Sequence, residues 1–180
     1  MGKNKLLVPL AGKPLVRHAV EGAVTSRARP VVVVTGHSGD EVETALYGLD
    51  VTFVRNGDFS MGLSTSLKCG LKTLPTDCAG AVILLGDMPN VTSALIDTLI
   101  AAFSPQQGHA ICVPVARGRR GNPVLWSKRF FPEIMALEGD IGAKALMDLH
   151  GPTIREVAVS HDGPLFDIDT LEALAAYKPA

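Results

Sequence analysis

The stretch AVILLGDMPNVTSALIDTLIAAF (residues 81–103) joins an apolar run, an acidic turn and a helical repeat. Ala81–Leu85 is continuously apolar, which is typical of a strand buried on both faces of a sheet. In the second part, one face of a helix would carry five large apolar residues: Leu95, Ile96, Leu99, Ile100 and Phe103. The stretch therefore predicts a strand followed by a helix, the repeating unit of an α/β protein.

The same alternation continues on both sides of this stretch. Further strands are predicted at Val31–Val34, Val51–Val54, Ala110–Val115, Val124–Trp126 and Ile154–Val159. Helices are predicted at Leu15–Val24, Asp40–Leu46, Leu63–Leu74 and Gly142–His150, with a closing helix from Thr170. The first, second and third of these strands have the composition of strands buried on both faces. We predict one α/β domain over residues 1–180, with a mostly parallel sheet.

Composition excludes several classes of protein. The chain has 180 residues, 47% of them hydrophobic, with 17 Lys+Arg against 18 Asp+Glu. A formal net charge of −1 is not that of a generally basic nucleic-acid binder, and the apolar runs are much shorter than the roughly 18 residues of a membrane span. The thiols of Cys69, Cys78 and Cys112 have no metal-site spacing. We expect a cytoplasmic protein that binds neither nucleic acid nor a membrane.

Polar residues follow three of the predicted strands. Thr35-Gly36 follows the first, Arg55-Asn56 the second and Gly86-Asp87 the third. Ligands of open α/β sheets bind at the carboxyl ends of the strands, so these residues are candidates for a site. A carboxylate held there suits Mg²⁺, which takes one or two carboxylates and completes its shell with phosphate and water. Alternatively, Asp87 caps the next helix or closes the turn before Pro89.

Asp167 and Asp169 offer a second carboxylate for such a metal. The two are spaced i, i+2, so they share one face of an extended segment. Asp169 also precedes the closing helix, where N-capping is the alternative function of its side chain.

Two basic clusters are candidates for binding anions. Lys3, Lys5, Lys13 and Arg17 precede the first acidic residue and suit a polyanion such as a nucleoside triphosphate, or form a solvated basic tail. The second cluster lies in a glycine-containing loop, and its members are Arg117, Arg119 and Arg120. Arginine binds phosphate in a bidentate manner, although solvated surface arginines explain this loop equally well.

A group of small residues begins the third predicted helix. Gly62-Leu63-Ser64-Thr65-Ser66-Leu67 offers backbone N–H groups and hydroxyls that can bind an anion or the edge of a base. N-capping explains one of the serines but not the whole group.

Eight motifs, in order along nearly the whole chain, resemble those of the nucleotidyltransferase family that includes molybdenum cofactor cytidylyltransferase and its guanylyltransferase relatives, the MobA-like family. They are Asn4-Lys5-Leu6-Leu7, Gly12-Lys13-Pro14-Leu15, Val34-Thr35-Gly36, Gly62-Leu63-Ser64-Thr65-Ser66-Leu67, Gly86-Asp87-Met88-Pro89, Gly121-Asn122-Pro123-Val124, Gly139-Asp140-Ile141-Gly142-Ala143 and Asp167-Ile168-Asp169-Thr170. GLSTSL, GNPV and GDIGA are most similar to the cytidylyltransferase branch.

The resemblance implies a Rossmann-like, three-layer αβα fold of the nucleotide-diphospho-sugar transferase type. It also implies a reaction in which the terminal phosphate of a molybdopterin cofactor attacks the α-phosphate of CTP and pyrophosphate leaves. Positioning and charge neutralisation are what such a transfer requires. The expected cofactor is Mg²⁺, and the expected partners are CTP, the molybdopterin cofactor and a recipient molybdoenzyme or its chaperone.

The resemblance assigns roles to individual residues. Asp87 and Asp169 would hold Mg²⁺, and Lys5 would neutralise the triphosphate. The nucleotide would contact Lys5, Thr35, Gly36, Asn56, Gly62, Ser64 and Ser66. The pterin substrate would contact Arg119, Arg120, Asn122, Pro123 and Asp140. Lys144 stands where the family often has arginine, so the charge is kept.

The family begins with a strand and a Gly-rich loop, LxAGxSxRMG, and Met1-Gly2 resembles the end of that loop. The resemblance therefore predicts an N-terminally incomplete domain: either the chain is truncated and impaired, or the upstream residues exist outside this sequence. Because the loop distinguishes cytidine from guanosine, a guanylyltransferase or a sugar-phosphate nucleotidyltransferase is an alternative. A non-catalytic module that binds and delivers the cofactor is another.

Overall fold

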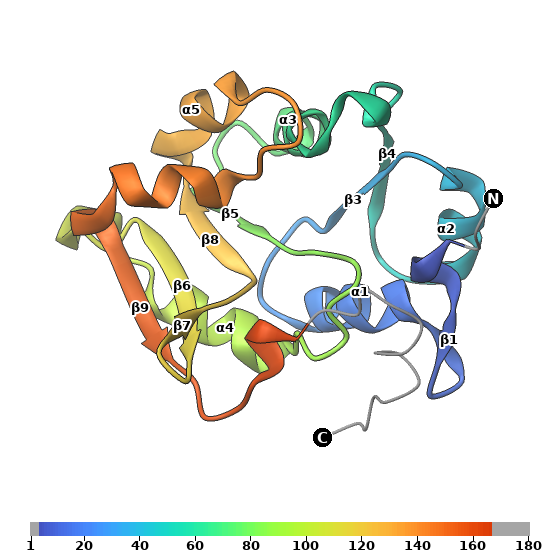
Figure 1. Cartoon of the computed structure of the whole chain (residues 1–180), viewed down its shortest axis with the longest axis horizontal. Coiled ribbons are helices and arrows are strands. Elements are labelled where there is room, and N and C mark those ends of the chain that lie inside the picture. Colours follow the sequence, from blue (N-terminus) through green and yellow to red (C-terminus); the bar gives the residue numbers. More distant parts are fainter. Residues whose placement is uncertain (1–3, 167–180) are drawn as a thin grey trace.

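The computed structural model describes residues 4–166. Strands form a central layer, with α3 and α5 on one side and α1 and α4 on the other (Figure 1). The three-layer α/β fold expected from the sequence is confirmed.

The strands are β1 (Pro9–Leu10), β2 (Lys13–Pro14), β3 (Val32–Thr35), β4 (Thr52–Arg55), β5 (Gly80–Ile83), β6 (Ile111–Ala116), β7 (Arg119–Arg120), β8 (Val124–Ser127) and β9 (Ile154–Ala158). The α-helices are α1 (Leu15–Thr25), α2 (Gly39–Ala45), α3 (Leu63–Thr73), α4 (Ser93–Ala102) and α5 (Phe131–Ala136). Most of these elements lie within two residues of the predicted bounds.

The strand pairing is mixed rather than mostly parallel. β3 pairs with β4 in parallel, and β6 pairs with β9 in parallel. β8 is antiparallel to both β5 and β6, and β7 is antiparallel to β6. The reason is a tight turn at Arg117-Gly118, where both residues have positive φ, which returns the chain beside β6 without a crossover helix.

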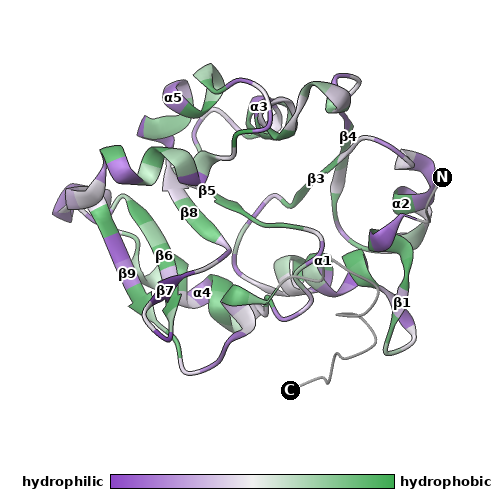
Figure 2. Cartoon of the chain, viewed as in Figure 1, coloured by the Kyte–Doolittle hydropathy of each residue, from purple (hydrophilic) through white to green (hydrophobic). Residues whose placement is uncertain are grey.

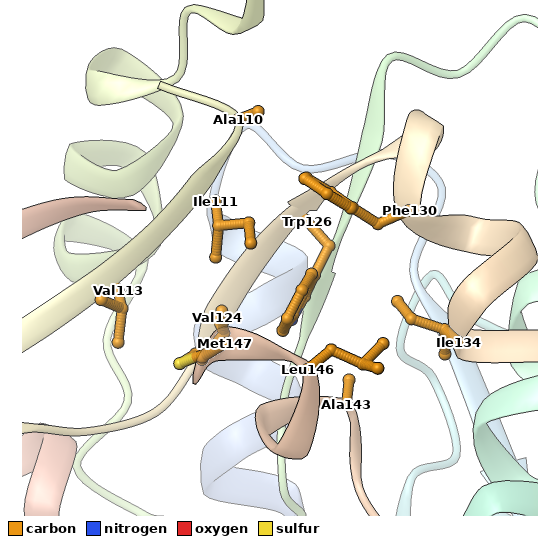
Figure 3. Close-up of a cluster of buried hydrophobic side chains, with 10 residues drawn as sticks. All are labelled: Ala110, Ile111, Val113, Val124, Trp126, Phe130, Ile134, Ala143, Leu146 and Met147. Carbon is orange, nitrogen blue, oxygen red and sulfur yellow. The ribbon is translucent and has the colours of Figure 1, made fainter. Parts of the chain in front are cut away.

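The largest core cluster lies between β6, β8 and the helices that cover them (Figure 3). Trp126 on β8 has no exposed surface, and its ring meets that of Phe130 edge-on at 5.8 Å between centroids. Figure 2 shows that hydrophobic residues dominate β6 and β8. On β6, burial raises the pKa of the Cys112 thiol to about 11. The prediction that Ala110–Val115 is a strand buried on both faces is confirmed for most of its length.

β3, β4 and β5 differ from that expectation. Their apolar residues are only half-buried, although the sequence predicts strands buried on both faces. Among the described residues, β3 pairs only with β4 and β5 pairs only with β8, so each of β3 and β5 has one unpaired edge. Helix α1 connects the two groups of strands: Val16 and Val20 lie in a cluster with Val33, whereas Ala23 lies in a cluster with Val82.

Two helical segments depart from the sequence prediction. Residues 143–149 form a 3₁₀-helix instead of an α-helix, with hydrogen bonds such as His150 N to Met147 O at 3.1 Å. Helix α5 was not predicted, because its six residues are too few to show a helical repeat. The predicted closing helix from Thr170 lies outside the described residues. No helix in the described part of the chain has the length and apolar character needed to cross a membrane.

Candidate active site

Three of the predicted site residues lie at or just beyond the carboxyl ends of strands β3, β4 and β5. Thr35 ends β3 and Asn56 follows β4, and the Asn56 N–H donates to the Thr35 carbonyl at 2.7 Å. Asp87 lies four residues beyond the end of β5. Since β3, β4 and β5 carry these residues at their carboxyl ends, this edge of the fold is the candidate site.

Lys5 and Asp87 form an ion pair at this edge. The Lys5 Nζ lies 2.8 Å from Asp87 Oδ2, and the two side chains are 42% and 17% exposed. Lys5 begins a short 3₁₀-helix, whose first turn is capped by the Asn4 side chain accepting from the Leu6 N–H at 3.1 Å. The structure thus brings together two residues 82 positions apart that the sequence assigned to the same reaction.

The other oxygen of Asp87 fits a divalent cation. Asp87 Oδ1 is buried and has no hydrogen-bond partner within the described part of the chain. A buried carboxylate oxygen without a partner is costly, and a hard cation such as Mg²⁺ would supply the missing interaction. Residues 4–166 contain no group of three or more side chains able to hold a metal ion, and the expected second ligand, Asp169, lies outside the described residues.

The start of α3 is built by contact with the segment 139–142. Gly62 has φ +108°, and a Cβ there would lie 2.3 Å from the Gly139 carbonyl carbon, so only glycine fits. The Ser64 N–H donates to the Gly139 carbonyl at 3.1 Å, and the Leu63 N–H donates to Asp140 Oδ1 at 3.3 Å. Two motifs far apart in the sequence, GLSTSL and GDIGA, therefore meet in space. This places Asp140 beside the predicted nucleotide-binding residues.

The Asn56 side chain hydrogen-bonds two side chains in the first turn of α3. Its Nδ2 donates to Thr65 Oγ1 at 2.8 Å and to Ser66 Oγ at 3.0 Å, while its Oδ1 accepts from the Asp58 N–H at 3.0 Å. Because both ends of the buried Asn56 amide are used within the protein, Asn56 orients the helix start in this conformation. Ser64 Oγ, also buried, has no partner among the described residues.

Thr35 and Gly36 differ in what they present to the site. The Thr35 hydroxyl is buried, 3.2 Å from where a Cβ on Gly39 would lie, so it faces the start of α2. Gly36 is exposed and packs under the Phe59 ring, which a Cβ at position 36 would approach to 2.9 Å. Phe59, which is 44% exposed, lies three residues before Gly62 of the GLSTSL motif and was not among the predicted site residues.

The loop predicted to bind the second substrate is only partly free. Arg117 pairs with Asp162, and Arg120 Nε lies 2.8 Å from Glu156 Oε1. The Arg119 side chain is exposed and makes no ion pair with the described residues. The Asn122 N–H donates to the Pro164 carbonyl at 2.8 Å, and Pro123, which follows a cis peptide bond, is buried.

The N-terminal basic cluster does not act as one group. Lys13 Nζ and Arg17 Nε both bind Glu21, at 2.8 and 3.0 Å. The hydrogen bond from Lys13, with a smaller one from Arg17, holds the pKa of the Glu21 carboxyl below its usual value. Of the cluster members that the structure describes, Lys5 is the one placed at Asp87.

Comparisons with known proteins add independent information. A family model described as a MobA-like NTP transferase domain matches residues 1–157. Bifunctional protein GlmU from Kineococcus radiotolerans is 36% identical over 114 residues, which are 62% of this chain and 23% of that protein. The chain thus spans less than a quarter of the length of this curated relative.

Solved structures match over nearly the whole chain. The manganese complex of Rv0371C from Mycobacterium tuberculosis superimposes with a TM-score of 0.79 and 26% identity, covering 97% of this chain and 91% of that one. A nucleotidyl transferase from Methanothermobacter superimposes with a TM-score of 0.80 and 26% identity, covering 95% and 82%.

Proposed function

Because the chain belongs to the MobA-like NTP transferase family, we propose that it is a Mg²⁺-dependent cytidylyltransferase acting on a molybdopterin cofactor. The observation that carries this proposal is the Lys5–Asp87 pair at the end of β5, with one Asp87 oxygen buried and without a partner. It supplies a cation for phosphate and a carboxylate for a metal at the edge of the sheet where ligands of such folds bind.

In the proposed reaction, an oxygen of the terminal phosphate of the cofactor forms a bond to the α-phosphorus of CTP. The bond from that phosphorus to the bridging oxygen breaks, and pyrophosphate leaves with the bond electrons. The Lys5 ammonium, 2.8 Å from Asp87, neutralises charge on the triphosphate. Asp87, with Asp169 as second ligand, would hold Mg²⁺, which when bound neutralises the charge developing on the phosphate oxygens. The manganese complex of the mycobacterial relative supports a divalent metal here.

The start of α3 is the proposed nucleotide side of the site. Because the N–H groups of Leu63 and Ser64 are bound to the segment 139–142, the hydroxyls of this turn would supply its contacts to the nucleotide. Ser66 and the backbone at Gly36 line the base and ribose, and Ser64 Oγ offers a buried hydroxyl without another partner in the described chain. Asn56 supports this wall by holding Thr65 and Ser66, and Gly62 allows its tight packing.

The pterin side of the site is proposed at the Asn122–Pro123 turn and the neighbouring arginines. Arg119 is available for an anionic group, whereas Arg120 must exchange its partner Glu156 to do the same. Asp140 lies at the start of α3, where its Oδ1 accepts a hydrogen bond from the Leu63 N–H. It would therefore contact the cofactor where cofactor and nucleotide meet. A recipient molybdoenzyme or its chaperone is the proposed partner for the product.

The test is calorimetric titration of the full chain with CTP, GTP and UTP, each with and without Mg²⁺. We expect CTP to bind more tightly than GTP or UTP, and Mg²⁺ to strengthen binding. A preference for GTP or UTP would point to a guanylyltransferase or a sugar-phosphate nucleotidyltransferase instead. Binding of no nucleotide with Mg²⁺ would contradict the proposal for this chain.

A further inference from the structure

A groove of about 510 Å³ lies between the end of β4 and one face of α3. Its walls come from residues 54–58 on one side and from Thr65, Lys68, Cys69, Lys72 and Thr73 on the other. This volume is within the range of sites for small molecules. Neither Lys5 nor Asp87 lines the groove, so it is separate from the pair that carries the proposed function.

The charges in this groove are arranged for an anion. Lys68 and Lys72 lie one turn apart on the same helix face, and neither makes a hydrogen bond or an ion pair with the described residues. Like charges at this spacing destabilise a helix unless a counter-charge is present. The one carboxylate in the lining is Asp58.

Arg55, the third cation of the lining, is already engaged. It pairs with Asp40, and its Nε lies 3.1 Å from Glu43 Oε1. These acids, Asp40 first, raise the pKa of the Arg55 guanidinium. The two lysines are therefore the cations free to bind a ligand, whereas Arg55 fixes the β4 wall to α2.

The groove also offers hydrogen-bonding groups. β4 pairs only with β3 among the described strands, so its outer edge has backbone groups without a strand partner. The hydroxyls of Thr65 and Thr73 line the α3 wall but already donate to backbone carbonyls, to Gly62 at 2.8 Å and to Cys69 at 3.0 Å, so the lysines are the side-chain donors left for a phosphate.

We propose that this groove binds a small molecule bearing one or more phosphate groups, with Lys68 and Lys72 as the cations that hold it. Lysine ammonium groups bind phosphate as point charges, and two on one helix face can share one phosphate or contact two linked ones. The groove shares Asn56 and Thr65 with the wall of the proposed nucleotide site, but its two lysines lie outside the Lys5–Asp87 pair, so the two proposals can fail separately.

The test is titration of the full chain with inorganic pyrophosphate in metal-free buffer containing a chelator. We expect wild type to bind, and K68Q/K72Q to weaken binding at least about tenfold, since two charge-assisted contacts are lost. The charge-retaining K68R/K72R should bind within a fewfold of wild type. The control R129Q/R155Q removes two exposed cations elsewhere and should bind as wild type does. A parallel titration with CMP shows whether a nucleoside phosphate uses the same lysines.

K5Q separates this site from the proposed reaction. Pyrophosphate binding that survives K5Q but is lost in K68Q/K72Q supports the groove even if the chain transfers no nucleotide. Binding that is lost in K5Q and kept in K68Q/K72Q would overturn the proposal, and so would the absence of binding to wild type.

A second readout needs no variant. Cys69 lines the groove and Cys78 does not, and both thiols are partly exposed. With labelling mapped peptide by peptide, pyrophosphate should slow modification of Cys69 and leave Cys78 unchanged. Equal rates at Cys69 with and without saturating pyrophosphate would contradict the proposal, whether or not K68Q/K72Q folds.

Discussion

The two halves of the sheet layer contain similar apolar strands but bury them differently. In the half formed by β6 and β8, Ile111, Val113 and Trp126 have no exposed surface. In β3, β4 and β5, together called the half-buried side, the valines are only half-buried. The difference follows from neighbours: β6 has a strand on each side, whereas β3 and β5 each have one strand neighbour in the described chain.

The strands that stabilise the fold are therefore not the strands that carry the candidate site. We expect β6 and β8, with their fully buried side chains, to contribute most to stability. The candidate site lies at the carboxyl ends of the half-buried strands β3, β4 and β5. Gly36 is exposed there and the Asp87 side chain keeps 17% of its surface exposed, so both can meet a ligand, whereas Thr35 and Asn56 are buried. We therefore expect stability and activity to respond to substitutions on different sides of this sheet layer.

The largest expected effect on stability is that of W126A. Removing a fully buried aromatic ring should lower the free energy of unfolding by about 3–5 kcal/mol. Urea unfolding followed by circular dichroism measures this. A loss below about 1 kcal/mol, the size of a typical substitution, would show that the β6–β8 half is not the main source of stability.

G62A tests the contact that joins α3 to the segment 139–142. The positive φ and the close approach of Gly139 should cost about 2–3 kcal/mol and weaken nucleotide binding by displacing the start of α3. Calorimetry and urea unfolding of the same variant measure both. G48A, also at positive φ but with no atom within 4 Å of its Cβ, is the matched control and should keep nucleotide binding.

V113A and V33A compare the two halves with one chemical change. Val113 is fully buried, so its truncation should cost about 2 kcal/mol. Val33 is half-buried, so its truncation should cost about 1 kcal/mol. Unfolding midpoints in parallel give the difference. Equal losses would mean that the contrast in burial has no energetic consequence.

The smallest expected effect is that of E21Q, because the side chains of the Lys13–Glu21–Arg17 group are partly exposed. The pKa of Glu21 is held below its usual 4.5. Its stabilisation is therefore present above pH 4.5 and is lost as the pH falls through the lowered pKa. E21Q should cost about 0.5 kcal/mol at pH 7 and nothing below the lowered pKa. A cost that grows on acidification would contradict this.

Sequence patterns predicted the elements better than their surroundings. Apolar runs and helical spacing located β3 to β6 and α1 to α4, because local periodicity reflects local structure. They did not reveal that β8 runs antiparallel or that β3 stays half-buried, since both depend on partners distant in the sequence. Lys5 and Asp87 were assigned to one reaction by resemblance. The packing of Phe59 over Gly36 and the Lys13–Glu21 pair required coordinates.

The most direct test of the central claim is the release of pyrophosphate from CTP by wild type and D87N, with Mg²⁺ and the molybdopterin cofactor present. If Asp87 carries the proposed reaction, D87N should lose about 100-fold or more of the rate. Its urea unfolding midpoint should stay close to that of wild type. Wild-type turnover by D87N, or no turnover by wild type itself, would contradict the account.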